Sequence, residues 1–137
     1  MNEEIELHDS KINAIGLNGS ALCFMLDAYV HSWEMVDCKW KGTGWMQPVQ
    51  IILSGATLAA TPDLPVLLCG GCLQTSQKTF DNKVTLPFTS PEPVNLRLEL
   101  ATAEVIDVHA RDVSIASIGP GRYVEQLPDD LRPKENG

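Results

Sequence analysis

Two cysteines that flank two glycines, the stretch CGGC at residues 69–72, are the residues most suggestive of chemistry. A CxxC pair can be a redox dithiol at the start of a helix, or half of a zinc site when a second pair follows. The residues after it lack helical spacing, and Cys23 and Cys38 do not form a second pair, although zinc held by all four thiols stays open if the fold gathers them. The third interpretation is a two-residue hairpin turn, because glycine readily supplies the positive φ of both central residues. We predict this turn, with Cys69 and Cys72 as its closing pair, and no bound metal; if a metal is bound, these two thiols are its expected ligands.

Acidic, hydroxyl and imidazole groups recur at every second residue in two other segments. Asp27, Tyr29 and His31 share one face of a strand by alternation, and Asp107 and His109 do the same further along the chain. An Asp–His pair can act as a general base or hold a metal ion, and the two faces would form a cleft if their strands were neighbours. The alternative is two solvated strand faces, which alternation also predicts.

The sequence His8-Asp9-Ser10 contains the three residue types of a catalytic triad, but adjacent residues on a strand point to opposite sides. We expect Asp9 or Ser10 to hydrogen-bond the local backbone instead. A GxSxG elbow and a glycine-rich phosphate loop are absent from the sequence. The sequence therefore predicts no catalytic residue.

Three tryptophans, Trp33, Trp40 and Trp45, lie within thirteen residues. Tryptophan is favoured at the centre of protein–protein contacts, so they could line an exposed binding surface. They could equally close one end of a barrel. Both interpretations stay open.

Period-two alternation predicts the elements that must position these groups. In residues 94–102 and 20–31 every second side chain is apolar, and the intervening ones are mostly polar. The other candidate strands are Lys11–Leu17, Trp45–Leu53, Val66–Cys69, Cys72–Thr75, Lys83–Phe88, Glu104–Ala110 and Asp112–Ile118. Turn signals between them are Asn18-Gly19, Ser54-Gly55, Gly70-Gly71, Asp81-Asn82 and Gly119-Pro120-Gly121.

Short strands joined by such turns predict one all-β domain over residues 1–127, an antiparallel β-sandwich or small β-barrel of about eight to ten strands. Residues 33–41 have no clean period and are expected to form a loop or a single helical turn. The tail at 128–137 is polar and is expected to be mobile.

The composition excludes several functions. The chain has 137 residues and a net charge of −8, so it repels phosphate backbones, and we expect neither nucleic acid nor an anionic membrane as a partner. No apolar run approaches the roughly 20 residues that cross a bilayer, and the acidic N-terminus does not look like a secretory signal. We therefore expect a cytoplasmic protein with free thiols and no cofactor.

Four short segments carry a resemblance: IELHDSKI at 5–12, DAYVH at 27–31, GTGW at 42–45 and RYVEQLP at 122–128. In this order they resemble a family of small uncharacterised bacterial proteins that opens with an ELHDS-type strand. More distantly, the HDS opening is similar to immunity-protein families of bacterial toxin systems. The resemblance implies no activity, but it marks as candidate binding residues His8, Asp9, Tyr29, His31, Trp45 and Tyr123.

These observations predict a non-catalytic protein that binds a protein partner, immunity-like or by self-association as a homodimer. The acidic surface and the tryptophan-rich segment would form the contact. The alternative is a module that binds a small ligand or metal through the two polar faces, and an enzyme of unknown class is the third possibility. The full set of candidate binding residues is His8, Asp9, Asp27, Tyr29, His31, Trp33, Trp45, Asp107, His109 and Tyr123.

Overall fold

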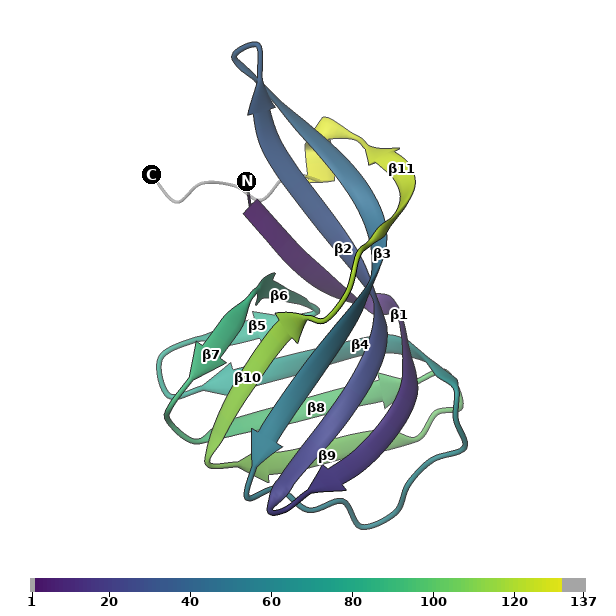
Figure 1. Cartoon of the computed structure of the whole chain (residues 1–137), viewed down its shortest axis with the longest axis vertical. Helices are drawn as coiled ribbons and strands as arrows, with labels where there is room; N and C mark the ends of the chain where they lie inside the picture. Colours follow the sequence, from purple (N-terminus) through teal and green to yellow (C-terminus); the bar gives the residue numbers. More distant parts are fainter. Residues whose placement is uncertain (1, 132–137) are drawn as a thin grey trace.

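The computed structural model describes residues 2–131, which form two layers of antiparallel strands and an arm that projects beyond them (Figure 1). The strands are β1 (Asn2–Asn18), β2 (Ala21–Val36), β3 (Lys39–Ser54), β4 (Val66–Thr75), β5 (Thr79–Asp81), β6 (Lys83–Leu86), β7 (Phe88–Ser90), β8 (Val94–Leu100), β9 (Val105–Ala110), β10 (Asp112–Ser117) and β11 (Arg122–Leu127). A 3-10 helix, η1 (Asp129–Leu131), follows them. The predicted all-β, sandwich-like fold is confirmed, with eleven strands in the described range and no closure into a barrel.

The strands follow one hydrogen-bonded order, β7-β10-β3-β2-β1-β4-β8-β9, with β11 on β3, β6 on β1 and β5 on β4. A short pairing of β1 with β4 joins the two layers, and the core lies between them (Figure 1). As alternation predicted, every second side chain of β2 from Leu22 to Val30 and of β8 from Val94 to Leu100 is buried. Each such aliphatic side chain stabilises the fold by about 1.5–3 kcal/mol through its burial.

The first three strands are far longer than the usual five or six residues, and they form two tight hairpins. Gly19, with φ of 64°, lies in the predicted first turn, where Asn18 pairs with Ala21. The second turn corrects the prediction of a loop or helical turn at 33–41. The strands there pair up to the tip, and Asp37 and Cys38 both take the positive φ of a hairpin turn.

The stretch CGGC is not a hairpin turn, so this prediction is wrong. Strand β4 runs through it without reversing, and neither Gly70 nor Gly71 has a positive φ. A Cβ on Gly71 would lie 2.9 Å from the carbonyl oxygen of Arg97 and 2.8 Å from Cδ1 of Leu7. The glycine is therefore needed because strands approach closely here, a role that sequence alone does not distinguish from a turn.

The two cysteines of this stretch consequently do not close a turn. Cys69 is exposed and Cys72 is half-buried, and both are free thiols. The Cys69 thiol donates weakly to the carbonyl oxygens of Glu99 and Leu100, at 3.5 Å from each.

The arm consists of the ends of four strands that extend past the sandwich (Figure 1). Its members are residues 2–6 of β1, 29–36 of β2, 39–46 of β3 and all of β11. In the predicted mobile tail, residues 129–131 form η1, and 132–137 lie outside the described residues. From Asn2 to Leu131, no helix has the length and apolar character to cross a bilayer.

Candidate functional site

The four segments that carry the resemblance lie on four adjacent strands of the arm: β1, β2, β3 and β11. The backbone register aligns Glu4, His31, Gly44 and Glu125 in one row across these strands. Their neighbours two residues away, such as Glu6 and Tyr29, occupy the same face because side chains alternate. Residues far apart in the sequence thus meet on one surface, which we call the arm site.

The HDS stretch forms an irregularity in β1 rather than a catalytic triad. The pairing of β1 with β2 is interrupted between Glu6 and Lys11, and Asp9 takes a φ of 77°. The Ser10 hydroxyl donates to the Glu6 carbonyl at 2.7 Å and accepts from the Tyr29 N–H at 3.0 Å. The predicted bonding of Ser10 to local backbone is confirmed, and the hydroxyl replaces ladder hydrogen bonds that the irregularity breaks.

This irregularity also sets the position of His8 and Asp9. The His8 N–H donates to Oδ1 of Asn82 at 2.8 Å, which ties the segment to the start of β6. The imidazole Nδ1 of His8 lies 3.3 Å from Oδ2 of Asp9, and both side chains are half exposed. The two groups therefore face solvent beside Glu6 of the arm site.

His31 is buried to 2% exposure between two carboxylates. Its Nε2–H donates to Oε2 of Glu6 at 2.8 Å, and its Nδ1 lies 3.9 Å from Oε1 of Glu4. Lys83 on β6 approaches the same Glu4 oxygen at 3.9 Å. Neither His31 Nδ1 nor Glu4 Oε1 has a hydrogen-bond partner among the described residues. Buried polar atoms are normally paired, so these two atoms are exceptions in the described part of the chain.

Two glycines of the GTGW segment make room for aromatic rings from β2. A Cβ on Gly44 would lie 2.4 Å from the hydroxyl oxygen of Tyr29, and a Cβ on Gly42 would lie 2.3 Å from Cζ3 of Trp33. Each ring therefore occupies the space that a side chain on the facing residue of β3 would fill. Trp33, one of the candidate binding residues, is 1% exposed, so its ring is buried and does not face a partner.

The Tyr29 hydroxyl lies in a strongly negative environment. Burial, a hydrogen bond to Glu125 and the charges of Glu125, Glu6 and Asp9 together raise its pKa to about 12. Its ring also meets the His31 imidazole edge to face, with centroids 5.2 Å apart. Three carboxylates around one phenol indicate a site that favours positive charge.

The raised pKa of Tyr29 predicts a loss of stability at high pH. The folded chain holds the phenol proton more tightly than the unfolded chain, whose pKa is near 10, so the free energy of unfolding falls as pH rises from 10 to 12. Urea unfolding at pH 9 to 12 should show a smaller fall for Tyr29→Phe than for the natural chain. Tyr123→Phe is the matched control and should follow the natural chain. Equal falls in all three chains would show that the Tyr29 environment is not negative.

Trp45 and Tyr123 lie on the opposite face of the arm from the Tyr29 hydroxyl. Their rings meet edge to face with centroids 5.5 Å apart, and the Trp45 N–H donates to Oγ1 of Thr43 at 2.8 Å. Trp45 is half-buried, whereas Tyr123 is 53% exposed. Of the candidate aromatic residues, Tyr123 is thus the one that presents a large free surface.

The remaining candidates do not join the arm site. Asp27 pairs with Lys11 at 3.7 Å on β1. Asp107 and His109 are exposed on β9, which three strands separate from β2, and Asp107 lies 3.8 Å from Arg97. The strands are not neighbours, so the condition for a cleft between the two polar faces is not met.

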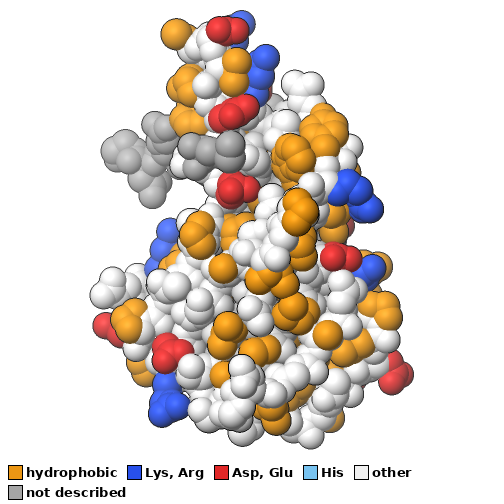
Figure 2. Space-filling model, in the orientation of Figure 1, with side chains coloured by type: hydrophobic (Ala, Val, Ile, Leu, Met, Phe, Trp, Pro, Cys, Tyr) orange, Lys and Arg blue, Asp and Glu red, His pale blue; other side chains and the backbone are white. Residues whose placement is uncertain are grey.

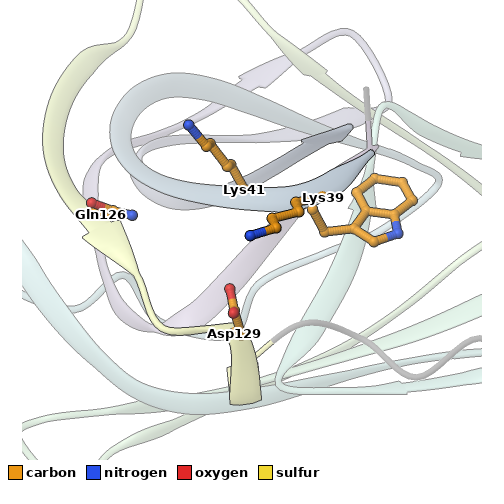
Figure 3. A pocket seen from close by; sticks show the side chains of 5 residues that line it. Lys39, Lys41, Gln126 and Asp129 are labelled. Atoms are coloured by element: carbon orange, nitrogen blue, oxygen red, sulfur yellow. The ribbon is translucent and has the colours of Figure 1, made fainter. Parts of the chain in front are cut away.

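An open pocket at the tip of the arm was not foreseen from the sequence. Lys39 and Lys41 of β3 extend over a space bounded by Gln126 of β11 and Asp129 of η1 (Figure 3). Sequence reasoning missed it because residues 33–41 were expected to be a loop. It also missed Glu4, whose only signal is its period-two spacing with Glu6 before the HDS stretch.

Comparison of the chain with protein-family models, curated proteins and solved structures found no match. The fold and the site define an all-β protein whose arm carries carboxylates, a buried histidine and a tyrosine on one face. The resemblance of the four segments to small bacterial proteins stays a prediction.

Proposed function

We propose that the protein is a non-catalytic binding protein of the bacterial cytoplasm that recognises a basic protein partner through its arm, in an immunity-like manner. The partner would add an extended segment to the free edge of β11. The observation that carries this proposal is that β11, within residues 2–131, pairs along one edge only and lies beside a cluster of carboxylates.

The edge of β11 is open to pairing. Within residues 2–131 this strand pairs with β3 alone, and every residue except Leu127 is exposed. Tyr123 is 53% and Val124 43% exposed, so two large apolar side chains are available for contact on this edge. Such an edge supplies backbone hydrogen bonds to an added strand, and its side chains supply specificity.

The charge around this edge favours a basic partner. Glu125 belongs to β11 itself, and Glu6 and Asp9 lie close enough to raise the pKa of Tyr29 beside it. Figure 2 shows acidic side chains along the arm, with basic and apolar ones between them. The whole chain carries a net charge of −8, so a second copy would be repelled where a basic protein is attracted.

Two hydroxyls of the arm site are poorly placed for covalent catalysis. Ser10 is held by backbone groups on both strands, so its oxygen has no free approach. Tyr29 stays protonated far above neutral pH because of its raised pKa, and a protonated phenol is a weak nucleophile. Both observations support binding over catalysis.

Photo-crosslinking in bacterial cells tests the proposal. A benzophenone side chain at position 124 of β11 should capture one basic protein, and the same group at position 105 of β9, another exposed site on an edge strand, should not. The captured protein, once purified, should bind the natural chain with an affinity that falls as salt rises, and it should bind Tyr123→Ser/Val124→Ser at least tenfold more weakly. Capture of another copy of this chain, or the same product from both positions, would overturn the proposal.

A further inference from the structure

We propose that Glu6, His8 and Asp9 form a binding site for a divalent first-row transition-metal ion. This site lies on β1 and its irregularity, and it shares Glu6 and Asp9 with the acidic surface described above. Its test needs only the chain and the ion, so it can fail or succeed whether or not the proposed partner exists. The inference departs from the sequence prediction, which assigned any metal to the thiols of Cys69 and Cys72.

The three side chains are already gathered. Each offers one ligand atom, and these atoms lie within 4.8 Å of one another. Ligands of a tetrahedral ion with bonds near 2.1 Å are about 3.4 Å apart, so only a small contraction is needed. His8 and Asp9 are half exposed and can make this movement, whereas Glu6 is mostly buried and fixed.

His31 provides the independent support for a ligand at this place. It is 2% exposed, and its Nε2–H donates to Glu6 at 2.8 Å. A carboxylate has room for both this hydrogen bond and a metal ion, and metal-binding carboxylates are usually held by such an outer residue. The other nitrogen of His31, Nδ1, lies 3.9 Å from Oε1 of Glu4 and so faces that carboxylate, not the three proposed ligands. The contribution of His31 to the site is therefore to hold the Glu6 carboxylate in place.

The negative charge of this surface also favours a bound cation. Glu4, Glu6 and Asp9 bring three carboxylates to this surface. Lys83 pairs with Glu4 at 3.9 Å, and Lys11 pairs with Asp27 at 3.7 Å. A bound divalent ion would offset the remaining repulsion between Glu6 and Asp9.

The donor set selects the class of ion. One imidazole with two carboxylates suits Zn²⁺, Mn²⁺, Fe²⁺ or Co²⁺, whereas Ca²⁺ and Mg²⁺ prefer oxygen ligands throughout. Three protein ligands leave coordination positions open on the exposed side, where water would bind. The site thus fits a weak or moderate metal centre with an open face.

Calorimetric titration of the chelator-treated full chain with Zn²⁺ tests the proposal. We expect one ion per chain, with an affinity that drops at least tenfold in His8→Ala, Glu6→Gln and Asp9→Asn. Asparagine keeps the left-handed backbone at position 9 without strain, so this variant preserves the irregularity. His109→Ala, a surface histidine on β9, and Cys69→Ser/Cys72→Ser should bind as the natural chain does.

His31 is tested separately as a positioning residue. His31→Gln keeps a donor for Glu6 and should retain most of the Zn²⁺ affinity, whereas His31→Leu should lose ten- to a hundredfold. Unfolding curves with and without Zn²⁺ identify any variant that fails to fold. Because the ion binds the folded state, Zn²⁺ should raise the melting temperature of the natural chain and not that of His8→Ala. Zn²⁺ binding that survives His8→Ala, or that disappears in the double cysteine variant, would overturn the proposal.

Discussion

Replacing Gly42 with alanine will destabilise the protein by about 1–3 kcal/mol, because the new methyl group collides with a buried ring. Its Cβ would lie 2.3 Å from Cζ3 and 2.5 Å from Cη2 of Trp33. The ring is 1% exposed, so it cannot move aside without losing packing or becoming solvated. Urea unfolding followed by far-ultraviolet circular dichroism measures the loss.

Gly16 is the matched control for this substitution. It lies in β1, has no positive φ and would have no atom within 4 Å of an added Cβ. Gly16→Ala should therefore leave the free energy of unfolding unchanged or raise it by about a few tenths of a kcal/mol. The gain arises because alanine lowers the conformational entropy of the unfolded chain. In a Trp33→Leu background the cost of Gly42→Ala should shrink, because the clash is gone. Equal stabilities of Gly42→Ala and Gly16→Ala would show that the ring does not lie over Gly42.

Replacing His31 with leucine will cost about 3 kcal/mol at neutral pH. The leucine fills a similar volume, but it removes the Nε2–H that donates to the largely buried carboxylate of Glu6. A buried acceptor that loses its donor carries the full desolvation penalty, which is largest for a charged group. The free energy of unfolding at pH 7 measures the effect.

Two further variants separate this charge effect from a packing effect. Glu6→Gln in the His31→Leu background should recover part of the loss, because one uncompensated charge is removed. His109→Leu alters an exposed strand position and should change stability by no more than about 0.5 kcal/mol. A His31→Leu protein that is as stable as His109→Leu would contradict the buried cluster.

The sandwich could be predicted from the sequence because the alternation of apolar and polar residues along a strand indicates which face is buried. The strand faces from Leu22 to Val30 and from Val94 to Leu100 were both predicted and are both buried. The glycines of CGGC could not be assigned, since a glycine that permits close approach and one that permits a turn have the same sequence signature. Residues 33–41 were misread because Trp33 is apolar on the polar face of β2, which breaks the alternation.

The arm site could be predicted only in pieces. Tyr29 and His31 were recognised as one face, and the resemblance marked segments on all four strands that build the site. Which of them meet depends on strand register, and register is set by long-range pairing that no local pattern records. The burial of His31 was hidden for a related reason, because a polar residue on an alternating strand normally predicts a solvated face.

The most direct test of the arm site is the nitrogen-15 NMR spectrum of the three histidine imidazoles, recorded before and after addition of Zn²⁺. The chain has only His8, His31 and His109, so each position reports separately. We predict a slowly exchanging Nε2–H for His31 with proton contacts to the Tyr29 ring, a Zn²⁺-dependent shift for His8, and no change for His109. Three solvent-like imidazoles, with His8 and His109 responding alike to Zn²⁺, would contradict both the buried cluster and the metal site.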